Sequence, residues 1–171
     1  MVHVKPHRIL YVALAAALVA SAAGCAAPAA QQPAEQKAPP GPSLYERVGG
    51  VNNIAMLIDD VVERSYASPV FMANARIHQA HMRFPKPIYK YQATAFACMA
   101  MGGPCKYTGR TPKEAHKDLG ITEVDWRELV RIFQESMTSF KVPAREQGEV
   151  LALIESAKAD VVAPALKSAS K

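Results

Sequence analysis

Residues 102–122, GGPCKYTGRTPKEAHKDLGIT, decide how this chain is divided into helices. Gly102 to Pro104 stops any helix that precedes it, because glycine favours a helix end and proline cannot continue a helix. Thr111 to Glu114 has the pattern of a capping box with proline at the first helical position. The helix that it opens is short, since Gly120 ends it, and it carries His116 in its middle. The stretch therefore predicts a chain built from helices, one of which is short and carries a histidine.

Apolar residues recur at three- and four-residue intervals on both sides of this stretch, as on the buried faces of helices. Asn52 or Asn53 can cap the first of these helices, which Pro69 closes. Residues 88–101 are apolar on nearly every side, which is typical of a helix that is buried on several sides. Residues 70–87 give no clear pattern. The apolar stripes are Ile54, Leu57, Ile58, Val61 and Val62; Trp126, Leu129, Val130, Phe133, Met137 and Phe140, after a start at Thr122; and Val150, Leu151, Ile154, Ala157 and Val161, after Pro143. No two-residue alternation accompanies them, so the sequence predicts an all-α protein.

Length and charge limit the class of protein. The chain has 171 residues, of which 50% are hydrophobic, and this gives room for one ordinary domain with a leader. It carries 20 basic and 15 acidic residues, a formal net charge of +5. The basic residues are scattered, whereas nucleic-acid binding needs them clustered on one face. We therefore expect no nucleic-acid partner.

The first 42 residues predict export and attachment to a membrane. Residues 1–24 combine a basic start, a short apolar run and small residues, the pattern of a secretory signal peptide. Cys25 resembles the cysteine of the bacterial lipobox, which is acylated and becomes the new N-terminus. The alternatives are cleavage elsewhere in the alanine-rich stretch and an uncleaved N-terminal anchor. Residues 25–42, rich in proline and alanine, predict a tether, and residues 164–171 a flexible tail. With Ala26 after the cysteine, the expected location is the periplasmic face of the outer membrane.

Two further pairs of residues could carry chemistry. Cys98 and Cys105 flank the Gly-Gly-Pro stop without CxxC spacing. They can pair in an oxidising compartment, but the apolar surroundings of Cys98 favour two free thiols. His78 and His81 would face the same side of a helix and could form half of a metal site. No convergent carboxylates accompany them, which favours a solvated connector.

Several strings, taken in order, resemble one known family. Ser43 to Gly50, SLYERVGG, resembles the opening of group 1 truncated haemoglobins. The family also carries GGP followed by Y-x-G-R, then a histidine and a GIT helix start, and residues 102–122 contain each of these. Val142-Pro143 and residues 158–162, KADVV, are similar as well. The likeness covers residues 43–163 and implies a truncated globin domain: a two-over-two helical sandwich that holds one haem b.

The resemblance also implies roles for individual residues. His116 falls on the proximal position, where the outer ring nitrogen binds the haem iron and the other needs an acceptor such as a backbone carbonyl. Residues at positions that commonly approach the haem are Tyr107, Ile121, Trp126 and Val130. Arg110, Lys113 and Lys117 are candidate partners for the haem propionates, or else belong to a solvated face.

The distal side departs from the family pattern. Many members carry a tyrosine on the first long helix that hydrogen-bonds bound oxygen, and the matching residue here is Val62, which cannot donate. Alignment back from Gly102 places Tyr89 at the ligand-facing position of the next long helix. Tyr91, His78 and His81 are the alternatives.

The resemblance implies reversible binding of a diatomic gas, oxygen or nitric oxide. We assign no catalytic residue, and turnover is an alternative: nitric oxide dioxygenation, which needs an unknown electron donor, or peroxidase-like activity. A second alternative is a haem-free globin fold that serves as an interaction lipoprotein.

Overall fold

The computed structural model describes residues 41–163, and within this range the chain forms nine helices and no strand, which confirms the predicted all-α class. The predicted signal peptide, Cys25, nearly all of the predicted tether and the predicted C-terminal tail lie outside the described residues. The helices are α1 (Leu44–Arg47), α2 (Gly50–Ala67), α3 (Pro69–Ala73), α4 (Ala75–Arg83), α5 (Lys86–Ala100), α6 (Pro112–His116), α7 (Glu123–Ser139), α8 (Ala144–Ser156) and α9 (Lys158–Val161). None of these described helices is long and apolar enough to cross a membrane.

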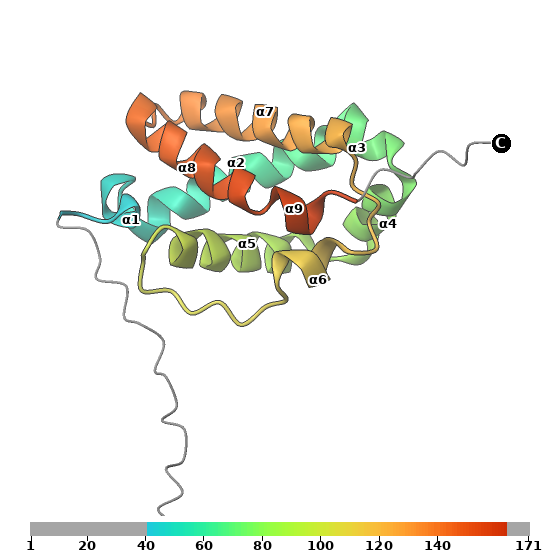
Figure 1. Ribbon diagram of the computed structural model, residues 1–171, viewed down its shortest axis with the longest axis horizontal. Helices are drawn as coiled ribbons and strands as arrows, with labels where there is room; N and C mark the ends of the chain where they lie inside the picture. Colours follow the sequence, from blue (N-terminus) through green and yellow to red (C-terminus); the bar gives the residue numbers. More distant parts are fainter. Residues whose placement is uncertain (1–40, 164–171) are drawn as a thin grey trace, which may run out of the picture. The chain divides into compact units, whose positions relative to one another are not determined.

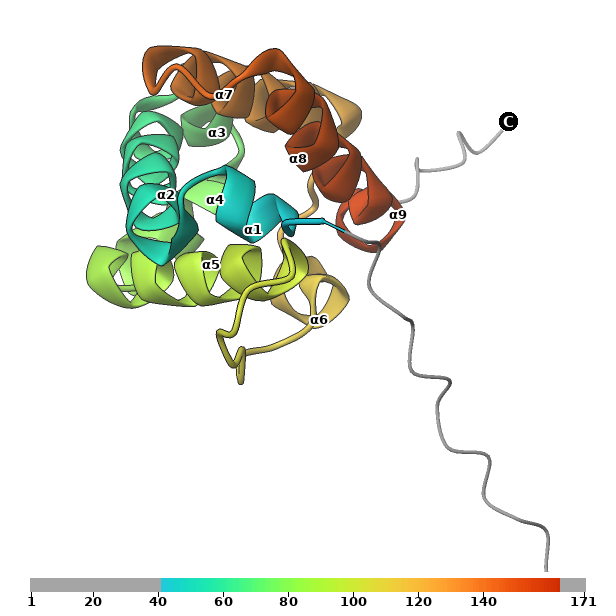
Figure 2. The ribbon, with the colours of Figure 1, turned by 90° about the vertical axis from the view of Figure 1, so that its left-hand side faces the viewer.

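Two pairs of long helices make up the domain. In Figure 1, α7 and α8 lie together at the top and α5 lies at the bottom, while α2 packs against both α5 and α7. Figure 2, turned by 90°, shows α2 standing between the α7–α8 pair and α5, with the short α6 beside α5. The pairs α2–α5 and α7–α8 are the two layers of the predicted two-over-two sandwich.

The core consists of two apolar clusters that share helix α2. One joins α2 to the end of α5, to α7 and to α8; its buried members are Leu44, Ile54, Leu57, Ile58, Val62, Cys98, Met101, Met137 and Val150. The other lies toward α3, α4 and the start of α7; its buried members are Val61, Phe71, Ile77, Ile121, Trp126, Ile132 and Val161. Burying a large apolar side chain contributes about 1.5–3 kcal/mol, so the stripe on α2 stabilises both layers. The sequence predicted this stripe correctly.

The ends of α2 differ from the prediction. Gly49, not Asn52 or Asn53, precedes the helix, and its φ of 90° is one that glycine adopts without strain. Asn53 lies inside the helix, and its side-chain amide donates to the carbonyl of Val48 at 3.0 Å. The helix ends at Ala67, and Pro69 occupies the first position of α3. Proline therefore opens a helix here instead of closing one, because its missing N–H costs nothing at a first helical position.

The short helix with His116 and the predicted C-terminal helix also need correction. His116 is the final residue of α6 instead of its middle, because the helix ends there and does not continue to Gly120. The predicted C-terminal helix is divided into α8 and α9 at Ala157, whose backbone still has a helical φ of −88°. Val161 nevertheless stays buried, in the second apolar cluster.

Residues 88–101 are not buried on several sides as predicted. Helix α5 begins at Lys86, and Cys98 is its one fully buried residue. Ile88, Tyr91 and Met99 are 49%, 69% and 42% exposed. The sequence pattern failed because lack of charge does not distinguish an inward from an outward apolar face.

Cys98 and Cys105 form a disulfide, so the prediction of two free thiols is wrong. The Gly-Gly-Pro turn folds the chain back and places the two Cα atoms 5.8 Å apart, within the range that a disulfide needs. The N–H of Gly103 donates to the carbonyl of Cys98 at 2.8 Å inside this turn. A side chain at Gly103 would collide with Tyr45 and Cys98. The turn geometry, which the spacing of the cysteines does not reveal, therefore makes the bond possible.

Candidate functional site

The short helix α6 is built by local interactions that orient His116. The side chains of Thr111 and Glu114 form the predicted capping box, and Pro112 starts the helix. Nδ1 of His116 lies 2.7 Å from the carbonyl oxygen of Pro112. A carbonyl can only accept, so Nδ1 carries the hydrogen and the outer nitrogen, Nε2, keeps a free lone pair. The backbone acceptor that the sequence analysis expected for this ring is therefore present.

The protonation state of His116 suits a metal ligand. Burial lowers the pKa of His116, the hydrogen bond to Pro112 opposes this shift, and the charge of Arg110 adds to it. The imidazole is accordingly neutral at neutral pH, as it must be to bind a metal through nitrogen. Among the described residues Nε2 has no hydrogen-bond partner. A haem iron thus fits the donor that α6 presents.

Tyr107 belongs to the loop that leads from α5 to α6. Its hydroxyl donates to the carbonyl of Arg110 at 2.7 Å, which closes the loop just before the capping box. The edge of its ring meets Phe96 of α5 with the centroids 5.1 Å apart. Tyr107 therefore links α5 to the segment that leads into α6.

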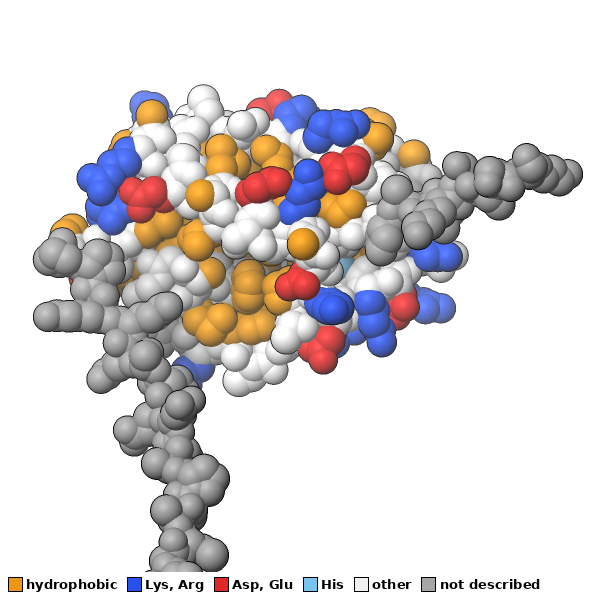
Figure 3. Space-filling model, viewed as in Figure 1, with side chains coloured by type: hydrophobic (Ala, Val, Ile, Leu, Met, Phe, Trp, Pro, Cys, Tyr) orange, Lys and Arg blue, Asp and Glu red, His pale blue; other side chains and the backbone are white. Residues whose placement is uncertain are grey.

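Ile121, Trp126 and Val130 lie in one apolar cluster around the start of α7. Ile121 and Trp126 are buried, and Val130 packs against the same cluster. The indole N–H of Trp126 donates to Oε2 of Glu155 on α8 at 3.0 Å. Figure 3 shows other hydrophobic side chains gathering at the surface between α8 and the loop that follows α5. Of the four residues expected near the haem, the structure thus brings Ile121, Trp126 and Val130 together and places Tyr107 against α5.

The candidate propionate partners surround α6. Arg110, Lys113 and Lys117 are exposed. Within residues 41–163, none of them takes part in an ion pair. Three cations without a bound carboxylate therefore lie beside His116, where they are available to an anionic group.

Of the tyrosines considered for the distal side, Tyr89 faces inward and Tyr91 outward. Tyr89 packs against the apolar cluster that contains Val62, and its hydroxyl has no hydrogen-bond partner among the described residues. Burial raises the pKa of Tyr89, so its hydroxyl stays protonated and able to donate. Tyr91 is 69% exposed, so the prediction that it could be the distal hydrogen-bond donor is wrong. Val62 lies in the packed core, as its apolar character predicts.

His81 forms an aromatic contact instead of a metal site. Its ring stacks on Tyr66 with the centroids 3.9 Å apart and the planes at 9°. Its Nδ1 is buried and has no hydrogen-bond partner in the part of the chain that the structure describes. Desolvation lowers the pKa of His81, and the charges of His78 and Lys86 add to the shift. The described residues contain no group of three or more metal-binding side chains, so the metal pair with His78 finds no further ligands.

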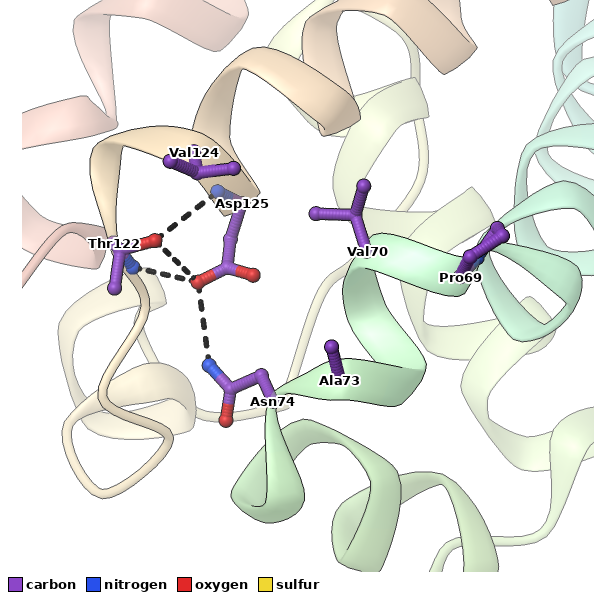
Figure 4. A pocket seen from close by; sticks show the side chains of 7 residues that line it. All are labelled: Pro69, Val70, Ala73, Asn74, Thr122, Val124 and Asp125. Atoms are coloured by element: carbon purple, nitrogen blue, oxygen red, sulfur yellow. Dashed lines mark hydrogen bonds between the residues drawn. The ribbon is translucent and has the colours of Figure 1, made fainter.

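Asn74 was not predicted from the sequence, yet it links the start of α4 to Gly120 and to the start of α7. Its Oδ1 accepts the N–H groups of Arg76 and Ile77 and so caps α4. Its Nδ2 donates to the carbonyl of Gly120 at 3.4 Å and to Oδ2 of Asp125 at 3.2 Å. Figure 4 shows this amide reaching the capping box of α7 across an open pocket between α3 and α7. Asparagine before a helix was the available signal, but the connector had no apolar pattern to mark a helix start.

Comparison with known proteins adds the family. The profile described as bacterial-like globin matches residues 43–163. The chain belongs to this family.

Individual relatives agree with this assignment. The globin is 27% identical over 142 residues to the group 1 truncated hemoglobin of Chlamydomonas moewusii, covering 80% of this chain and 77% of the relative. It is 33% identical over 85 residues to a group 1 truncated hemoglobin of Synechocystis, covering 45% of this chain and 57% of the relative. The crystal structure of the Fe(III) form of truncated hemoglobin from Tetrahymena pyriformis superposes with a TM-score of 0.61 at 20% identity, covering 72% of this chain and 100% of that one. The predicted truncated globin fold is therefore confirmed.

Proposed function

We propose that this globin belongs to group 1, holds one haem b through Nε2 of His116 and reversibly binds oxygen or nitric oxide. The observation that carries the proposal is the 2.7 Å contact between Nδ1 of His116 and the carbonyl of Pro112, which leaves Nε2 free and the ring neutral. The two relatives named above, both group 1 truncated hemoglobins, support it. When bound, the haem supplies an iron atom on which a diatomic gas can bind.

The remaining residues of the site have distinct tasks in this proposal. Apolar walls exclude water from the haem; they are formed by Tyr107 on one side and by Ile121, Trp126 and Val130 on the other. Arg110 and Lys113, which are exposed beside α6, bind the propionates. Tyr89 donates its hydroxyl hydrogen to the bound gas, a task that Val62 cannot perform.

A test of haem binding needs three variants with one histidine changed in each. The wild-type protein, purified with haem available, should show a Soret band. His116→Ala should lose the band, whereas His78→Ala and His81→Ala should keep it, because these two residues lie on α4. Circular dichroism would verify that the His116 variant keeps its helices. A wild-type protein without a Soret band would reject the proposal in favour of a haem-free interaction lipoprotein.

We further propose that the globin is exported and anchored through an acylated Cys25 at the periplasmic face of the outer membrane. The Cys98–Cys105 disulfide supports this, because structural disulfides persist in oxidising compartments and are rare in the cytosol. It also accounts for the odd number of cysteines, since acylation would occupy the third.

Metabolic labelling with palmitate tests the anchor. The wild-type chain should take up the label and fractionate with the outer membrane. Cys25→Ala should lose the label and the membrane fraction while keeping the Soret band. Label retained by Cys25→Ala, or a wild-type chain released into the soluble periplasmic fraction, would contradict the proposal.

A further inference from the structure

Helix α5 carries an apolar row on its outer side that no described residue covers. The row consists of Ile88, Tyr91, Ala95 and Met99, spaced by three, four and four residues, which places them on one face of the helix. The three large side chains are 49%, 69% and 42% exposed. Residues 91–105 contain no charged side chain at all. A continuous exposed apolar face of this kind is typical of a surface that binds something.

The chain enters the domain at the C-terminal end of this same helix. The N–H of Tyr45 donates to the carbonyl of Met101, one residue after α5, at 2.9 Å. The carbonyl of Pro42 is held by a side-chain nitrogen of Arg47, also at 2.9 Å. In Figures 1 and 2, α1 lies at this end of α5. The chain therefore enters the described domain near the end of the apolar row that carries Met99.

The length of the preceding chain limits the distance to the proposed anchor. Residues 26–40 separate Cys25 from the described domain. Fifteen residues span at most about 50 Å even when fully extended. Attachment of this kind makes contact between the domain and the membrane effectively intramolecular, so that a weakly binding surface is enough.

We propose that the outer row of α5 rests on the lipid surface to which Cys25 anchors the globin. The inference rests on the proposed lipid anchor. Charged side chains are costly in the acyl region of a membrane, and this face presents none between residues 91 and 105. Lys90, at the other end, is turned toward α2, where Asp59 and Glu63 bind it.

A second copy of the chain fits this surface less well. Stable protein interfaces bury about 800 Å² on each partner. Three half-exposed side chains and one alanine offer much less than this. A lipid surface needs no matching partner shape, and the anchor supplies the proximity that a small apolar area cannot.

Covalent footprinting of the attached protein tests the proposal. The chain from Cys25 onward is coupled through the Cys25 thiol to a maleimide-bearing lipid in vesicles of phosphatidylethanolamine and phosphatidylglycerol. The disulfide keeps Cys98 and Cys105 from reacting. A carbene reagent then labels exposed side chains, and mass spectrometry reads each peptide. Labelling of Tyr91 and Met99 should fall several-fold on attachment, while labelling of Val124, 53% exposed on α7, should not change.

Two matched variants test whether the protection depends on the apolar row. Ile88→Glu combined with Tyr91→Glu should abolish the protection of Met99, because a charged row leaves the lipid surface. Val124→Glu should keep it. Unchanged labelling of the row on vesicles would overturn the proposal, and so would protection that appears without vesicles and grows with protein concentration, since that result indicates a second copy.

The design separates this inference from the proposed anchor. Chemical coupling does not depend on acylation in the cell, so a failed palmitate experiment leaves the footprint readable. A Soret band, measured on the same vesicles, reports separately on haem binding. Loss of protection with an intact Soret band therefore counts against the docking surface alone.

Discussion

The Cys98–Cys105 disulfide gives the sharpest quantitative prediction. It closes a loop whose ends are separated by 7 positions. In the chain-entropy model, cross-linking a loop of about eight residues lowers the entropy of the unfolded chain enough to stabilise the fold by about 2.5 kcal/mol. Cys105→Ala should therefore lower the free energy of unfolding by about this amount. For a domain of this size that corresponds to a fall of roughly 10 °C in Tm.

The choice of cysteine matters, because Cys98 has no exposed surface and Cys105 is only half-buried. Cys105→Ala removes the cross-link and leaves the Cys98 sulfur in the core. The double variant with Cys98→Ala also empties the space of that sulfur and should cost about 1 kcal/mol more. The difference between the two variants thus separates the cavity from the cross-link.

Urea unfolding, followed by circular dichroism at equal haem saturation, is the assay. Reductant should bring the wild-type protein to the stability of Cys105→Ala and leave that variant unchanged. A loss below about 0.5 kcal/mol in Cys105→Ala would refute the entropic reasoning. If reductant lowered the stability of the wild-type protein and of Cys105→Ala equally, its effect would not come from the disulfide.

Three further predictions concern the two sides of the site. Asn74→Ala should lower the free energy of unfolding by about 1–3 kcal/mol, because it removes the cap of α4 and a hydrogen bond to a carboxylate. Asn52 is exposed and lies inside a helix, so Asn52→Ala should change the free energy of unfolding little. Thermal melts of the two variants test this difference. Tyr89→Phe should speed oxygen dissociation in stopped-flow measurements and Tyr91→Phe should not; slow, equal rates in both would exclude a tyrosine donor. Burial lowers the pKa of folded His81 below 6.5, so the unfolded chain takes up the proton first and stability should fall as pH drops below 6.5. His81→Phe keeps the ring stacked on its neighbour without titrating, so its melts should show a smaller fall, and identical slopes would contradict the assignment.

Features set by neighbouring residues could be predicted from the sequence. The capping box of α6 and the proline that starts the helix depend on interactions over three or four positions. The apolar stripe of α2 depends on helical periodicity alone. Both were predicted, and the likeness to a known family gave the sandwich that joins them.

Features set by distant partners could not be predicted. Helix α4 depends on Asn74, whose amide reaches residues 46 and 51 positions further along the chain. The pairing of Cys98 with Cys105 depends on the shape of a turn. The outward face of α5 has the same composition as an inward one, so only the packed structure shows that Tyr91 is exposed.

The position of α1 has a consequence for the order in which the protein folds. The N–H of Tyr45 donates to the carbonyl of Met101, and Arg47 forms ion pairs with Glu146 and Glu149 on α8. A helix of four residues is too short to persist by itself. The helix that comes first along the described chain is thus among the last to dock. The contacts of Arg47 with α8 can form only after α8 itself has folded.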